Sequence, residues 1–295
     1  MKKFLLFAMV MILLSAFSQV FAQPAPPNAL LIVREEIKPG MMGVHNRHSA
    51  EFASTFSELK TPNYRIAMVP VAGNENEVLY ITALDSFAEL EQVNRATDSK
   101  LEGATGMTRA KLDRLDKEGP VLHAGMRDML AIFRPELSFN PGVNIAQMRY
   151  FSVTTTRVKP GYDAQYVDYI QKILNVARRD PKAKANDLHL AVFQIISGAQ
   201  AGMYLTFRPM KSLAEMDDPI ARRVQAGMTD DQRKDADKAL RETVMSGESS
   251  VYAFAPRMSY VEKDMAAADP AFWNPKPMMA TEPKPKKRAP SHHRR

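Results

Sequence analysis

The sequence of 295 residues contains no cysteine and a single tryptophan. Without cysteine there can be no disulfide framework, no thiol catalysis and no cysteine-ligated metal. The common catalytic and phosphate-binding patterns GxGxxG, GxxxxGK[ST], GxSxG and HExxH are also missing. A chain of this length can bury a sizeable core without disulfides. These absences narrow the chemistry but leave the fold class open.

The formal net charge of +7 is located at the two ends of the chain. Residues 23–275 are close to neutral, so the sequence does not predict nucleic-acid binding. Residues 266–295 are rich in proline, lysine and arginine, a composition that buries too little apolar surface to fold. We expect a disordered tail, either simply solvated or in weak electrostatic contact with an anionic envelope surface. His292 and His293 stand too isolated there to predict a metal site.

The N-terminus has the three parts of an export signal. Lys2 and Lys3 precede an apolar run over residues 4–17, and Val20-Phe21-Ala22 forms a small-x-small cleavage site. The run is shorter than the roughly 20 residues of a membrane span, although an uncleaved anchor is the alternative. No later stretch reaches 18 apolar residues. The sequence therefore predicts a signal peptide over 1–22, a periplasmic or secreted product, and no transmembrane segment.

Internal similarity is the strongest architectural signal. Five short segments recur in the same order, at offsets between 121 and 126 residues, which predicts a duplication. The pairs include Ile37-Lys38-Pro39-Gly40 with Val158-Lys159-Pro160-Gly161, Leu79-Tyr80-Ile81-Thr82 with Met203-Tyr204-Leu205-Thr206, and Ile132-Phe133-Arg134-Pro135 with Ala253-Phe254-Ala255-Pro256.

Each copy has the pattern of a β-α-β-β-α-β unit, the ferredoxin-like order. Apolar strands are expected over 30–37, 64–71, 78–84 and 129–133 in the first copy, and over 148–158, 189–196, 202–208 and 250–254 in the second. Capping boxes at Ser86 and Ser212 begin the second helical region of each copy, and a further box begins at Thr229. The sequence thus predicts ferredoxin-like repeats over 23–140 and 141–265.

Two such units in one chain resemble the dimeric α+β barrel superfamily in its fused form. That superfamily includes antibiotic-biosynthesis-type monooxygenases, NIPSNAP proteins and haem proteins such as chlorite dismutase. The resemblance covers roughly residues 29–262. It implies an α+β fold in which two four-stranded sheets form one intramolecular barrel covered by helices.

The first helix of each repeat carries two polar aromatic residues on its predicted inner face. At 100° per residue, His45 and His48 fall within the apolar stripe formed by Val44, Phe52, Phe56 and Leu59. Tyr166 and Tyr169 stand at the equivalent positions 121 residues later. One interpretation is a ligand pocket between helix and sheet, where the resembled superfamily binds substrates or haem. The other is that all four are ordinary core residues.

No metal is predicted, because Glu51, the nearest third ligand, would have to converge with His45 and His48 from one helix. No cofactor is predicted either. Haem on His48 stays an alternative, although chlorite-dismutase-like proteins take their haem histidine from the C-terminal repeat. The only tryptophan, Trp273, follows the second repeat. His123 is expected in a loop or helix cap without a role, and residues 34–36 face either the barrel interior or its rim.

The functional hypothesis is an exported protein that binds a small apolar or aromatic molecule, with monooxygenase-like chemistry implied by the resemblance. The alternative is a non-catalytic envelope interaction module tethered by its basic tail. A haem-binding protein is the second alternative. Whether the protein is an enzyme stays open at this point.

Overall fold

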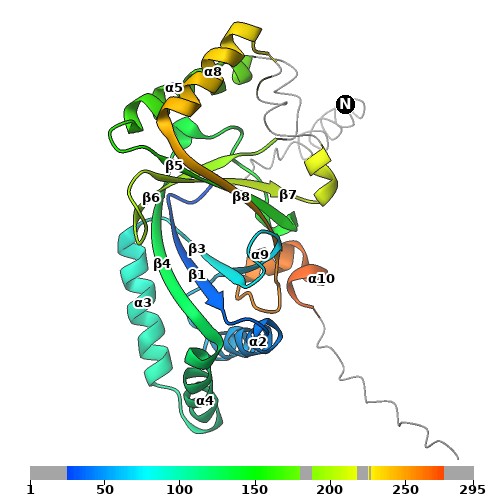
Figure 1. Cartoon of the computed structure of the whole chain (residues 1–295). Coiled ribbons are helices and arrows are strands. Elements are labelled where there is room, and N and C mark those ends of the chain that lie inside the picture. The colour runs from blue at the N-terminus through cyan, green and yellow to red at the C-terminus, as the bar shows by residue number, and fades with distance from the viewer. Residues whose placement is uncertain (1–24, 180–187, 218–224, 226, 276–295) are drawn as a thin grey trace, which may run out of the picture.

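Eight antiparallel strands close into a barrel (Figure 1). Their order around the barrel is β1 (Ala29–Ile37), β3 (Glu77–Leu84), β2 (Ile66–Ala72), β8 (Val244–Phe254), β5 (Tyr150–Val158), β7 (Met203–Met210), β6 (Ala191–Ser197) and β4 (His123–Phe133). The computed structural model describes residues 25–179, 188–217, 225 and 227–275. The predicted signal peptide and the tail from residue 276 lie outside the described residues. No helix among the described residues is long and apolar enough to cross a membrane.

The first repeat follows the predicted order, with its second helical region divided in two. Its elements are β1 (Ala29–Ile37), α2 (Met42–Leu59), β2 (Ile66–Ala72), β3 (Glu77–Leu84), α3 (Phe87–Glu102), α4 (Gly106–Leu122) and β4 (His123–Phe133). Gly40 in the Lys-Pro-Gly turn has a φ of 79°, and the equivalent Gly161 has a φ of 83°. Because L-residues avoid this left-handed conformation, the glycine explains why the turn recurs in both copies.

The second repeat contains β5 (Tyr150–Val158), α5 (Asp163–Arg179), β6 (Ala191–Ser197), β7 (Met203–Met210), η3 (Leu213–Asp217), α8 (Asp230–Thr243) and β8 (Val244–Phe254). The 3-10 helices η1 (Pro135–Leu137) and η2 (Ile145–Gln147) connect the repeats. The box at Thr229 is complete in α8. At Ser212 the hydroxyl accepts a bond from the amide of Ala214, but this start opens only the short η3.

The two repeats complete one barrel within the chain. β2 pairs with β8, with Met68 opposite Phe254, and β4 pairs with β6, with Phe133 opposite Phe193. Every strand therefore has two neighbours and no edge is left open. The predicted α+β fold with an intramolecular barrel of two ferredoxin-like repeats is confirmed.

Strand alternation places one set of side chains inside the barrel and the other beneath the helices. On β1, Leu30 and Ile32 join the interior cluster, whereas Val33 and Ile37 pack in the cluster that includes Met41 and Met42. The interior cluster is the main core: Leu30, Ile32, Met68, Leu79, Ile81, Met129, Ala131, Phe151, Val153, Phe193, Ile195, Leu205, Phe207, Tyr252 and Phe254 are among its buried members.

Three sequence expectations need correction. β4 and β8 begin at His123 and Val244, six residues earlier than expected, because their polar first halves continue the pairing with β1 and β5. Val44 is 42% exposed and does not belong to the inner face of α2. The folded part also extends past residue 266, because α9 (Lys263–Ala268) and α10 (Pro270–Trp273) are helical and Trp273 is buried.

Candidate functional site

The structure places all four predicted site residues on the buried faces of their helices. His45 and His48 lie on α2, and Tyr166 and Tyr169 lie on α5. The two pairs belong to different repeats and lie under different helices on the outside of the barrel, so they do not form a shared site. Their environments decide what each can do.

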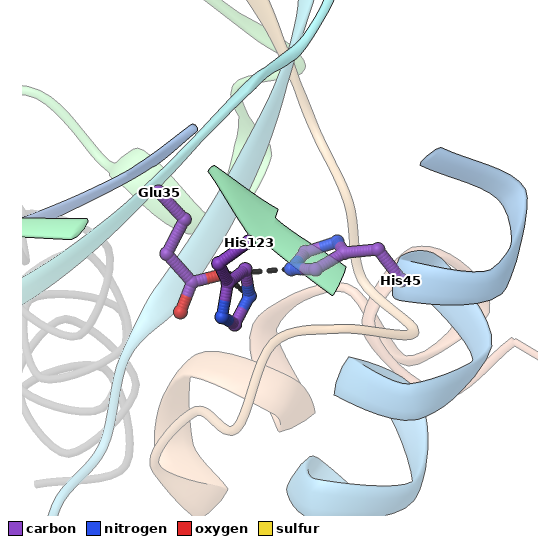
Figure 2. A group of neighbouring side chains, drawn as sticks. All are labelled: Glu35, His45 and His123. Atoms are coloured by element: carbon purple, nitrogen blue, oxygen red, sulfur yellow. Dashed lines mark hydrogen bonds and ion pairs between the residues drawn. The ribbon is translucent and has the colours of Figure 1, made fainter. Parts of the chain in front are cut away.

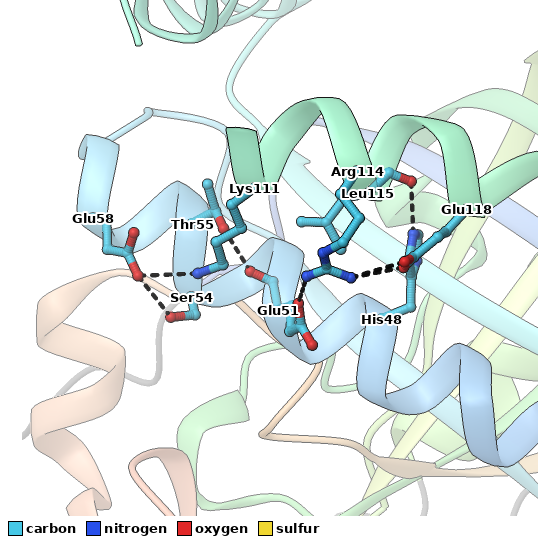
Figure 3. Close-up of polar contacts among 9 residues, drawn as sticks. All are labelled: His48, Glu51, Ser54, Thr55, Glu58, Lys111, Arg114, Leu115 and Glu118. Carbon is cyan, nitrogen blue, oxygen red and sulfur yellow. Dashed lines mark hydrogen bonds and ion pairs between the residues drawn. The ribbon is translucent and has the colours of Figure 1, made fainter. Parts of the chain in front are cut away.

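His48 connects the two helices of the first repeat. Its Nε2 lies 2.8 Å from the carbonyl oxygen of Leu115 on α4 (Figure 3). Its ring also meets Phe52 edge to face at 5.1 Å. On the exposed side of the same interface, Arg114 pairs with Glu51 and Glu118. His48 is therefore a packing residue between α2 and α4, and its Nε2 is already paired.

This arrangement does not fit haem on His48. An axial histidine needs a ring nitrogen directed at the iron, with space for the macrocycle. The His48 Nε2 instead faces the backbone of α4, where it lies 2.8 Å from the carbonyl oxygen of Leu115. This nitrogen is therefore already engaged and is not directed at a ligand site.

The tyrosines of the second repeat are also packed. Tyr166 packs against Tyr204 with ring centroids 5.1 Å apart and the rings tilted, and both belong to the cluster between α5 and the sheet. Tyr169 packs with Met228 and Ala236 against α8, and its buried hydroxyl has no hydrogen-bond partner among the described residues. Neither tyrosine lines the two large cavities described below.

His45 has a different environment, because two side chains that the sequence analysis left without a role converge on it. Its Nε2 lies 2.7 Å from Glu35 Oε2, and the His123 Nε2 lies 3.4 Å from the same oxygen (Figure 2). The rings of His45 and His123 meet edge to face at 5.3 Å. One ligand atom from each of the three residues lies within 4.8 Å of the others.

A register shift in the sheet produces this convergence. β1 and β4 are antiparallel, and the shift between Glu36 and Ile37 places His123 opposite Ile37. Glu35 and Ile37 share the outer face of β1, and paired residues share a face, so His123 stands beside Glu35. His123 is the C-cap of α4, one of the two positions expected for it, and also the first residue of β4. The expectation that it has no role did not take this position beside Glu35 into account.

A polar network continues from this group towards the centre of the first repeat. Tyr80 donates a 2.8 Å hydrogen bond to Ser49 Oγ, which lies 3.3 Å from His45 Nε2. The Arg65 guanidinium stacks over the Tyr80 ring at 4.7 Å and over the Phe56 ring at 5.1 Å. Ser49 therefore contacts the same ring nitrogen of His45 as Glu35 does, which links the group to Tyr80.

Burial and charge act in opposite directions on the ionisable groups. Burial disfavours ionisation of Glu35, but the His45 hydrogen bond and the charges of His123, His45 and Arg65 together bring its pKa below the usual value. Burial lowers the pKa of His123, and Glu35 only partly offsets this. Both shifts therefore favour an ionised Glu35 carboxylate beside a neutral His123 imidazole near pH 7.

A large, mainly apolar cavity of about 930 Å³ lies at one end of the barrel interior. Its walls come from the first residues of β1, β2, β5 and β6, the last residues of β3 and β7, the 141–147 connection, and α9. Lining side chains include Leu30, Ile66, Ile81, Phe151, Phe193 and Phe207. The cavity draws on both repeats, and only the closed barrel creates it.

The other end of the barrel interior is polar and closely filled. Arg34 pairs with Glu77, and the Tyr252 hydroxyl donates to Glu77 Oε1. The remaining cavity there is only about 40 Å³. Arg34 therefore faces the interior, which settles the question that the sequence left open for this residue.

A second large hollow of about 760 Å³ lies between α2 and α4. It is an open surface groove lined by Met41, Val44 and Val121 together with charged residues of α4. His45 and His48 do not line it. Neither this groove nor the barrel-end cavity is lined by any of the four residues predicted for a helix–sheet pocket, His45, His48, Tyr166 and Tyr169.

No family model matches the chain, and no curated protein matches it. Solved structures with a similar fold include an anthrone oxidase-like protein, with 12% identity and a TM-score of 0.48. The match covers 79% of this chain and 93% of that protein's chain. A candidate monooxygenase from Fusobacterium nucleatum is 8% identical with a TM-score of 0.45, and the match covers 78% of this chain and 93% of that one. A candidate chlorite dismutase is 9% identical with a TM-score of 0.45, and the match covers 81% of this chain and 98% of that one. Since one fold hosts many activities, identities this low carry no function across.

Proposed function

We propose that the protein binds a small apolar molecule in the 930 Å³ cavity at the end of the barrel. The observation that supports the proposal is the lining itself, in which aliphatic and aromatic side chains from both repeats surround one space of drug-like size. Asn144 and Gln147 supply polar groups that could orient a ligand. This proposal keeps the predicted class of ligand but moves the site from the helix–sheet space to the barrel interior.

A more specific proposal would be that the protein also oxidises the bound molecule, as a monooxygenase does. Among the described residues that line the cavity, the ionisable ones are Glu262 and Asp264, both exposed at the N-terminus of α9. An acid–base catalyst works from a position within hydrogen-bond reach of the reacting group. We therefore propose binding and assign no residue to oxidation.

The test is titration with a neutral apolar fluorophore such as phenylnaphthylamine. Ala191→Phe should fill the cavity from β6 and weaken binding by about tenfold or more, because the probe would lose its contact surface. Ala83→Phe narrows the same cavity from β3 and is the second variant. Ala88→Phe, on the exposed side of α3, is the matched control. Wild-type affinity in both folded cavity variants would disprove the proposal.

We also propose that the protein is exported, on the basis of the N-terminal sequence. The expected mature product begins at Gln23 after cleavage following Ala22. Fractionation of producing cells followed by N-terminal sequencing measures this directly. A full-length product in the cytoplasm would contradict it.

A further inference from the structure

Glu35, His45 and His123 come from three different elements and lie together between the outer face of the sheet and α2. Glu35 is on β1, His45 on α2, and His123 at the start of β4. None of them lines the barrel cavity, so an inference from this group is independent of the proposed function.

The group brings two imidazoles to one carboxylate oxygen, whereas an ion pair that only stabilises the fold needs one. Glu35 Oε2 and His45 Nε2 already form a hydrogen bond, yet a second imidazole approaches the same oxygen. The His123 Nε2 is buried and makes no hydrogen bond with the described residues. Buried polar atoms normally have partners, so a ring nitrogen left unpaired beside a carboxylate indicates a missing ligand.

We propose that Glu35, His45 and His123 bind one divalent transition-metal ion of the zinc class. Two imidazoles and one carboxylate are a donor set that suits zinc and iron(II), whereas magnesium and calcium prefer oxygen ligands alone. Bonds of about 2.0–2.2 Å in a tetrahedral site hold the ligand atoms about 3.3 Å apart. The separations of 2.7 and 3.4 Å from Glu35 Oε2 bracket this value.

The ion takes the place of the hydrogen bond between Glu35 Oε2 and His45 Nε2. It gives His123 a partner and removes the need for two imidazoles to compete for one oxygen. Three protein ligands leave at least one coordination position for water or a substrate, as in catalytic zinc sites. The side chains of Glu35 and His123 are 13% and 20% exposed, so the group lies near the protein surface although the His123 Nε2 itself is buried.

The metal used for the test is zinc. Zinc binding is measured by calorimetry on the EDTA-treated full chain, in a His292→Ala, His293→Ala background that removes the tail imidazoles. We expect one zinc ion per chain and a rise in melting temperature on zinc addition. Cobalt(II) substitution should give the visible absorption of a nitrogen- and oxygen-ligated ion.

Glu35→Gln and His123→Ala should each weaken zinc binding by about a hundredfold or more, since loss of even an outer-shell partner costs 10–100-fold. His189→Ala is the matched control, because His189 lies in the second repeat and bonds the carbonyl of Asn140. Glu35→Gln is isosteric and decides the question if His123→Ala does not fold. No stoichiometric zinc uptake, or unchanged affinity in folded Glu35→Gln, would overturn the proposal.

Discussion

Trp273 Nε1 donates a 2.8 Å hydrogen bond to the carbonyl oxygen of Ala146 in η2. The indole is 4% exposed and packs against Phe254, with ring centroids 5.9 Å apart. Asp269 at the start of α10 pairs with Arg149, which lies before β5. The segment after the second repeat is therefore part of the barrel core.

Trp273→Ala should lower the free energy of unfolding by about 3–5 kcal/mol, the usual cost of removing a large aromatic side chain from a core. Chemical denaturation measures this. Truncation after Asn274 is the matched control and should leave the melting temperature unchanged, because the indole and its contacts stay in place. Equal stability of Trp273→Ala and the wild type would show that α10 is peripheral.

Tyr252→Phe should cost about 1–3 kcal/mol, because it removes a hydrogen-bond donor from the buried Glu77 carboxylate. Tyr162→Phe is the control: Tyr162 is 43% exposed, and the same change there should stay within about 0.5 kcal/mol. Thermal and denaturant melts of the three proteins provide the comparison. A neutral Tyr252→Phe would mean that Arg34 alone stabilises Glu77.

His48→Ala should destabilise the protein by about 1–3 kcal/mol and leave probe binding unchanged, because His48 bonds α4 and does not line the cavity. Tyr169→Phe should be neutral or slightly stabilising, since it removes a buried hydroxyl without a partner among the described residues. Both are measured by melts and by titration of the apolar probe. Loss of probe binding without loss of stability would show that the ligand binds between the helices and the sheet and not in the barrel cavity.

Stability should fall between pH 10 and about 12 as buried tyrosines ionise. Burial, only partly offset by a hydrogen bond with Thr156, raises the pKa of Tyr166 to about 12. A group with a raised folded-state pKa stabilises the fold below its unfolded pKa of about 10, and this contribution is lost as the pH rises through about 12.

Denaturant melts across this pH range, with tyrosinate absorbance as a second signal, check the alkaline loss. For Tyr166 alone the loss is roughly 2–3 kcal/mol, from a difference of about two pKa units. Tyr166→Phe should therefore lose less stability than the wild type over the same interval. Identical pH dependence in the two proteins would rule out Tyr166 as a contributor.

Much of the site could not be predicted, for reasons visible in particular residues. The helical period correctly placed His45, His48, Tyr166 and Tyr169 on buried faces, because that period is a local property. Glu35 could have been assigned to the outer face of β1 by alternation with Val33 and Ile37. His123 could not, since its position depends on where α4 ends and on the register shift in the sheet.

The sequence by itself determined the duplication, the order of strands and helices and the turns that end β1 and β5, because these depend on local periodicity and on residues that favour particular backbone angles. Only the tertiary structure decided which groups meet. The closed barrel leaves an apolar cavity at one end and buries Arg34 with Glu77 at the other. It also brings His123 to Glu35 and His45 from 78 or more positions away, a distance that no local pattern spans.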